Sequence, residues 1–128
     1  MQRVWIGLGA LAGLTATAMA ALAAHGLSRL DASAVQMMRV AVDMQGWHAL
    51  ALLACGLWQV RGGRLANWAG AAFAFGIVLF CGAVYTLVLA GLRLPWMAPV
   101  GGTLLMLGWL LLALSAFVRP RPRAATLP

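Results

Sequence analysis

The side chains that could bind a ligand are few, and two of them lie close together in the chain. Gln45 and His48 are three residues apart, which places an amide and an imidazole on one face of a helix. Burying such groups in an apolar environment costs free energy unless they are hydrogen-bonded. One interpretation is therefore an outward-facing polar pocket for a small molecule, an ion, a quinone or a haem, with these candidate ligand-binding residues: His25, Gln45, His48, Tyr85, Gly101 and Gly102.

The same residues also have a purely structural interpretation. His25 precedes Gly26 at the end of an apolar stretch, where an imidazole complements the helix dipole and the glycine caps the helix. Gln45 lies on the face of His48 and can hydrogen-bond it. Gly101 and Gly102 leave the first turns of a helix without side chains, so another backbone or a ligand can approach. The sequence leaves both interpretations open.

Arg39 and Asp43 are four residues apart, a spacing that brings opposite charges together on one helical face. If Val60 marks the inner boundary of a membrane helix, helical rise places Arg39 about 31 Å from it, at the outer interface, and Asp43 about 25 Å from it, below that interface. Charged pairs at such a position usually form an ion pair without a further role. We therefore predict an interfacial ion pair.

A metal site, a cofactor and enzymatic activity are not predicted. The two histidines and the nearby methionines do not follow the spacing of any recognised metal or haem site. Helical rise puts Cys55 about 8 Å and Cys81 about 24 Å from the inner boundary, too far apart for a disulfide. The chain has no Gly-x-Ser-x-Gly, Cys-x-x-Cys or His-Glu-x-x-His motif and no glutamate. We expect a protein that is not an enzyme.

Apolar segments take up most of the 128 residues and must position these groups. The chain is 64% hydrophobic and 9% charged, a composition typical of an integral membrane protein. A bilayer core about 30 Å thick needs roughly 20 apolar residues of helix. The sequence predicts an all-α polytopic protein with one transmembrane domain, residues 1–118, and four spans: 4–24, 45–60 with a helical extension from 34, 65–90 and 99–118.

The N-terminal segment has an alternative interpretation. Arg3, an apolar run and Ala18-Met19-Ala20 are similar to a secretory signal with its cleavage site. Because the apolar run continues to Ala24, we expect an uncleaved first helix. Ser33 is expected to cap the helix that begins at Ala34.

Nine arginines and no lysine, against two aspartates, give a net charge of +7. The arginines lie at the ends of the predicted spans, so membrane orientation explains them better than nucleic-acid binding. Four spans would put six arginines on the side of the termini and three on the other, which predicts that both termini are cytoplasmic. Residues 119–128 are then a basic, Pro-rich cytoplasmic tail.

Small residues at four-residue spacing allow membrane helices to approach closely. Gly9 and Gly13 have this spacing in the first span, and Gly70 and Ala74 have it in the third. Four short helices cannot bury all such faces, so we predict a homo-oligomer or a subunit of a membrane complex, with the lipid bilayer as the surrounding partner.

Several short motifs together resemble one family, and they are Ala23-Ala24-His25-Gly26-Leu27, Gln45-x-x-His48-Ala49-Leu50-Ala51-Leu52-Leu53, Phe80-x-Gly82-x-x-Tyr85, Pro99-x-Gly101-Gly102 and Gly108-Trp109. The chain is similar, from Gly7 to about Phe117, to the YgdD-like family of small four-helix bacterial inner-membrane proteins, a family of unknown function with a distant relative among small eukaryotic transmembrane proteins. It differs where Asp43, Met44 and Cys81 stand, since the family usually has a basic residue, an aromatic and a serine there.

The resemblance implies a fold and a topology but no activity. Two functions from different classes follow from the residues, and the first is the one that the sequence favours. The first is a non-enzymatic interaction or accessory protein of the bacterial inner (plasma) membrane, whose polar cluster holds the helices together. The second is a binding or translocation protein with a polar pocket for an unidentified small-molecule ligand.

Overall fold

The computed structural model describes residues 1–26 and 30–117, which are helical apart from short connections. The helices are α1 (Gln2–His25), α2 (Ala32–Ala90) and α3 (Met97–Phe117). All three are long and apolar enough to cross a membrane. Residues 27–29, which include Arg29, and the predicted tail 119–128 lie outside the described residues.

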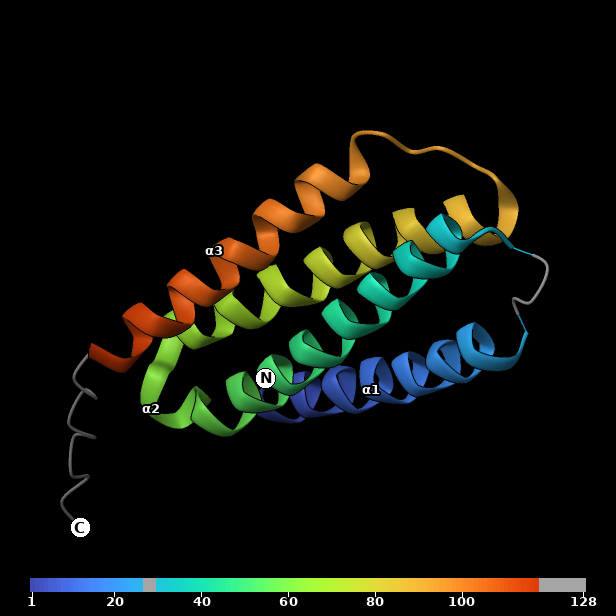
Figure 1. The fold of residues 1–128 in the computed structure, drawn as a ribbon. Coiled ribbons are helices and arrows are strands. Elements are labelled where there is room, and N and C mark those ends of the chain that lie inside the picture. The colour runs from blue at the N-terminus through green and yellow to red at the C-terminus, as the bar shows by residue number, and fades with distance from the viewer. Residues whose placement is uncertain (27–29, 118–128) are drawn as a thin grey trace, which may run out of the picture.

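Helix α2 combines the second and third predicted spans. The sequence predicted four separate helices, and the structure has three helical elements in the described residues. Gly63, with φ 55° and ψ −131°, is the residue with non-helical dihedral angles inside α2. A straight helix of 59 residues would be about 88 Å long, far more than a bilayer core. The chain instead reverses direction at Gly63, and residues 32–62 and 64–90 lie side by side (Figure 1).

Helices α1 and α3 both pack on α2 and, within the described residues, not on each other. They flank the α2 hairpin on opposite sides (Figure 1). The hairpin therefore forms the centre of the molecule, and its largest fully buried side chains include Phe73, Met38 and Leu52. Leu105 of α3 completes the core against Gly76, where a Cβ atom would lie 2.6 Å from the leucine Cδ2.

Close helix contacts depend on glycines that were expected to mediate self-association. A Cβ atom on Gly9 would lie 2.9 Å from the carbonyl oxygen of Ala49, and one on Gly70 would lie 2.7 Å from the Trp5 ring. Both glycines therefore pack inside the chain. Gly13 has nothing within 4 Å of the same position. Helix α1 thus approaches α2 closely near its N-terminus and leaves more space near its C-terminal half.

Helix α2 begins two residues earlier than predicted. Asp31, not Ser33, is its N-cap, because the Asp31 carboxylate accepts a hydrogen bond of 2.7 Å from the Ala34 amide. The Ser33 hydroxyl donates to the same carboxylate at 3.1 Å. These two bonds, with the Ala34 amide as the larger cause, lower the pKa of Asp31. At the other end, Gly91 adopts the left-handed conformation (φ 66°, ψ 10°).

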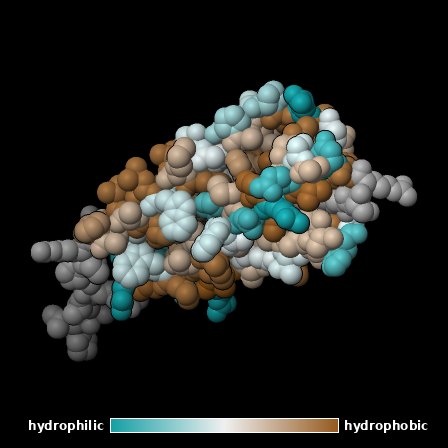
Figure 2. Space-filling model, viewed as in Figure 1, coloured by the Kyte–Doolittle hydropathy of each residue, from teal (hydrophilic) through white to brown (hydrophobic). Residues whose placement is uncertain are grey.

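The helix ends gather at the two ends of an elongated body. The start of α1, the bend of α2 and the end of α3 lie at one end, and both connections between helices lie at the other (Figure 1). Figure 2 shows a largely apolar surface interrupted by a few hydrophilic patches, the largest toward the end with the connections. A surface of this kind suits a lipid environment.

Candidate functional site

The amide of Gln45 joins α1 to both halves of α2. Gln45 lies in the first half of α2 and is 4% exposed. Its Nε2 donates hydrogen bonds to the Ala12 carbonyl oxygen at 2.9 Å and to Thr15 Oγ1 at 2.6 Å, both in α1. Its Oε1 accepts a bond of 2.7 Å from Tyr85 Oη in the second half of α2. We call Thr15, Gln45, Tyr85 and the Ala12 carbonyl the Gln45 cluster.

The Ala12 carbonyl fixes every proton in this cluster. A carbonyl oxygen only accepts, so the amide atom beside it must be the nitrogen of Gln45. Both amide hydrogens are then occupied, and Oε1 must accept from the Tyr85 hydroxyl. The Thr15 hydroxyl donates to the Leu11 and Ala12 carbonyls at 3.0 and 3.1 Å. All side-chain donors of the cluster are therefore occupied inside the protein, and only acceptor lone pairs remain.

His48 belongs to a second cluster, formed with α3. Its Nδ1 lies 2.6 Å from the Met44 carbonyl oxygen, and its Nε2 lies 3.0 Å from Trp109 Nε1. The carbonyl only accepts and the indole N–H only donates, so the imidazole is neutral, with its proton on Nδ1. Phe73 and Trp109 surround the ring, with centroids 5.6 and 5.9 Å from it. Neither ring nitrogen is left to bind a metal or haem.

The predicted ligand-binding residues do not form one cluster. Gln45 and Tyr85 meet, but His48 faces α3 and is not hydrogen-bonded to Gln45. His25 is exposed at the end of α1, and Gly26 adopts a right-handed conformation rather than the left-handed one of a typical glycine cap. In the described part of the chain, no three His, Cys, Asp or Glu residues converge as metal ligands do.

Gly101 contacts protein rather than a pocket. A Cβ atom at Gly101 would collide with the backbone of Phe80 in α2, so this glycine permits close packing of α3 on α2. At Gly102 the same atom would meet only Phe80 Cδ2, at 3.8 Å. The Gly-Gly element thus works as a packing surface at its first position and has free space at its second.

The predicted ion pair is not formed. Arg39 and Asp43 are both exposed, and no salt bridge joins them in the structure. Both instead line a shallow hollow of about 210 Å³ beside Ala20, Ala23 and Ala24 of α1. Exposure explains the absence, since long charged side chains at a surface gain little free energy from pairing.

Some residues of the two clusters were not predicted from the sequence. Trp109 is the hydrogen-bond partner of His48, and Thr15 is that of Gln45. Trp5 also donates a bond of 2.8 Å to Asn67 between α1 and α2. A usable signal exists for each, because a polar group in an apolar span needs a partner at the same depth in another span. Matching depths between spans would have found Trp109 opposite His48.

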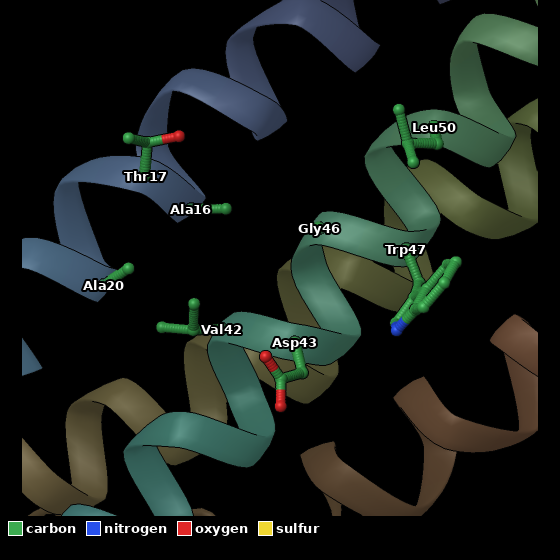
Figure 3. A pocket seen from close by; sticks show the side chains of 8 residues that line it. All are labelled: Ala16, Thr17, Ala20, Val42, Asp43, Gly46, Trp47 and Leu50. Carbon is green, nitrogen blue, oxygen red and sulfur yellow. The ribbon is translucent and has the colours of Figure 1, made fainter.

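Two grooves flank α1. The first, the small-residue groove, has a volume of about 480 Å³ and lies between α1 and the first half of α2. Figure 3 shows α1 residues on one side of it and Asp43, Trp47 and Leu50 on the other, and its complete lining is Ala16, Thr17, Ala20, Val42, Asp43, Gly46, Trp47 and Leu50.

The second groove lies against the other half of α2, and we call it the lateral groove. Its volume is about 450 Å³, and its walls are apolar except at the Gln45 cluster, which lies in its lining. Gly82 lines it too, with nothing within 4 Å of its Cβ position. The rest of the lining is Leu8, Leu11, Ala12, Met19, Leu52, Ala74, Ile77, Val78 and Cys81.

Comparison with known proteins assigns a family. Residues 19–102 match the family described as "Protein of unknown function (DUF423)". The chain belongs to this family. It is 36% identical over 119 residues to a UPF0382 membrane protein of Haemophilus influenzae, a match that covers 91% of this chain and 96% of the relative. It is 38% identical over 118 residues to a UPF0382 membrane protein of Staphylococcus saprophyticus, covering 91% and 98%.

A UPF0382 membrane protein of Staphylococcus epidermidis is also 38% identical, over 116 residues that cover 89% of this chain and 95% of the relative. No solved structure matches the chain. This protein is thus a membrane protein from a family whose function is unknown, and its relatives' names indicate no enzymatic activity.

Proposed function

We propose that this DUF423 protein is a non-enzymatic interaction or accessory protein of the bacterial inner membrane, which self-associates or joins a membrane complex. The main support is that its interior polar groups already have hydrogen-bond partners within the protein. No buried side-chain nitrogen or oxygen in the described part of the chain lacks a hydrogen-bond partner. Gln45 and His48 connect helices, which leaves neither of them free for chemistry on a substrate.

The topology we propose has four crossings with both termini in the cytoplasm, in a bundle like that of the YgdD-like proteins. Two features support it. Each half of α2 is at least as long as one bilayer crossing requires, and the bend at Gly63 lies between them. Arg3, Arg61 and Arg64 belong to the end with the N-terminus and the bend, and positive residues are retained on the cytoplasmic side.

The small-residue groove is the surface that we propose for self-association. Gly9 and Gly70 pack inside the chain and are not available. The groove keeps small side chains on α1 opposite Gly46, which has nothing within 4 Å of its Cβ position. Trp47 beside it is 66% exposed and supplies a large apolar surface. Close helix packing in membranes depends on surfaces of this kind.

Gly46→Leu tests the interface, because its side chain fills the groove without a backbone clash. The protein in lipid nanodiscs should contain more than one copy, measured by stepwise photobleaching, and Gly46→Leu should shift it to one copy. Gly82→Leu is the matched control, since it fills the lateral groove instead and should leave the copy number unchanged. If the unsubstituted protein is a monomer in nanodiscs and forms no crosslinks in native membranes, the proposal is wrong.

A further inference from the structure

The lateral groove combines an apolar wall with a polar site whose hydrogen-bonding character is fixed. Thr15, Gln45 and Tyr85 line the groove together with aliphatic side chains from α1 and from the second half of α2. Its volume of about 450 Å³ is within the range of small-ligand sites. Because it opens between membrane-spanning helices, a molecule can reach it from the lipid.

The polar part of the groove can accept hydrogen bonds but has none to donate. Both Gln45 amide hydrogens, the Thr15 hydroxyl and the Tyr85 hydroxyl donate to partners within the protein. A phenolic oxygen that donates still has lone pairs, and an amide oxygen has a second one. The groove is therefore complementary to a ligand that donates a hydrogen bond from an otherwise apolar molecule.

This requirement for a hydrogen-bond donor distinguishes between the possible classes of ligand. Quinone carbonyls and haem carboxylates are hydrogen-bond acceptors. In the groove they would face the acceptor oxygens of Tyr85 and Gln45, and no hydrogen atom would be available for a bond. A phosphate headgroup is an acceptor too, and neither Arg nor Lys lines the groove. A neutral lipid with a hydroxyl group provides both the donor and the apolar chain.

We propose that the lateral groove binds a lipid alcohol, whose chain lies along the aliphatic wall and whose hydroxyl donates a hydrogen bond to Tyr85 Oη or Gln45 Oε1. The inference goes beyond the accessory role proposed above and does not depend on self-association. A prenol and a diacylglycerol share the required chemistry, and the test distinguishes these two sources.

The experiment measures binding of geranylgeraniol and of dioleoylglycerol to the full chain in nanodiscs, each against its methyl ether. The ether keeps the chain but cannot donate a hydrogen bond. At least one alcohol should bind about five- to tenfold more tightly than its ether, the expected effect of one hydrogen bond. The alcohol that shows this preference identifies the source. Equal affinity of alcohol and ether for both lipids would overturn the proposal.

Two variants locate the site. Gly82→Leu places a side chain in the lateral groove, where the glycine has nothing within 4 Å of its Cβ position, and should reduce alcohol binding at least tenfold. Gly46→Leu fills the small-residue groove and should leave alcohol binding unchanged. If Gly82→Leu lowers the copy number and leaves alcohol binding unchanged, the groove holds a second copy and the lipid proposal is wrong. If only Gly46→Leu changes the copy number and only Gly82→Leu weakens alcohol binding, both proposals stand.

Discussion

At the scale of single residues, two aromatic donors determine what the buried polar groups can do. The Trp109 indole satisfies His48 Nε2, and the Tyr85 hydroxyl satisfies Gln45 Oε1. A second proton, on His48 Nε2, would point at the N–H of Trp109, which is also a donor. This packing therefore favours the neutral imidazole. The polar residues that suggested a binding site from the sequence therefore act first as connections between helices.

The Trp109–His48 bond should contribute measurably to stability. Trp109→Phe leaves a buried nitrogen without a donor and should lower the free energy of unfolding by about 1 kcal/mol. Adding His48→Leu to Trp109→Phe should cost less than the sum of the single effects, because neither partner then remains unsatisfied. Steric trapping in bicelles measures these free energies. Trp47→Phe, at a 66% exposed ring, is the control and should have little effect. Strictly additive effects would contradict the bond.

Two glycines of α1, one turn apart, should respond oppositely to alanine. The Gly9→Ala methyl group would lie 2.9 Å from the Ala49 carbonyl oxygen, so it should separate α1 from α2 and cost about 1–3 kcal/mol. Gly13 has nothing within 4 Å of its Cβ position, so Gly13→Ala should add about 0.5–1 kcal/mol of stability through helix propensity. Unfolding measurements on both variants decide this, and a stabilising Gly9→Ala would contradict the packing described above.

At the scale of elements, glycines with positive φ end or redirect the helices. Gly91 adopts the left-handed conformation, which Asn tolerates, whereas Gly63 at φ 55° and ψ −131° lies far from that region. We expect Gly91→Asn to cost less than about 1 kcal/mol and Gly63→Asn about 1–3 kcal/mol. The thermal unfolding temperatures of the two variants in mild detergent, each compared with that of the unsubstituted protein, measure these costs. Equal tolerance of Asn at both positions would show that the α2 bend does not depend on glycine.

The sequence predicted the helical segments far better than their contacts. Apolar runs located α1, α3 and both halves of α2 to within a few residues, because span length follows from bilayer thickness. The faces of these helices could not be predicted, since lipid-facing and protein-facing side chains are equally apolar. Gly9 and Gly70 were therefore expected at an outer surface, and His48 was expected beside Gln45 rather than Trp109. The Ser33 cap was wrong because Asp31, two residues earlier, provides the stronger acceptor.

At the scale of the whole molecule, the α2 hairpin is the scaffold on which α1 and α3 pack separately. Because these outer helices do not touch within the described residues, spaces remain beside α1, and the two grooves occupy them. A four-helix arrangement with α1 against α3 would have closed part of this surface. The open sides of the hairpin are therefore the places where a lipid or a second protein chain can bind.

The orientation of this body in the membrane is the last prediction. With the bend cytoplasmic, Arg64→Cys should be protected in intact cells from a membrane-impermeant maleimide. Leu92→Cys, at the opposite end, replaces a side chain that is 54% exposed and should be labelled. The native Cys55 and Cys81 are buried, so their background should be low, and a variant with both replaced by alanine provides the control. In the arrangement of four spans predicted from the sequence, six arginines would fall on the side of the bend and three on the other, which favours this orientation. Labelling of Arg64→Cys with protection of Leu92→Cys would mean the inverted topology, and labelling of both in intact cells would mean a dual one.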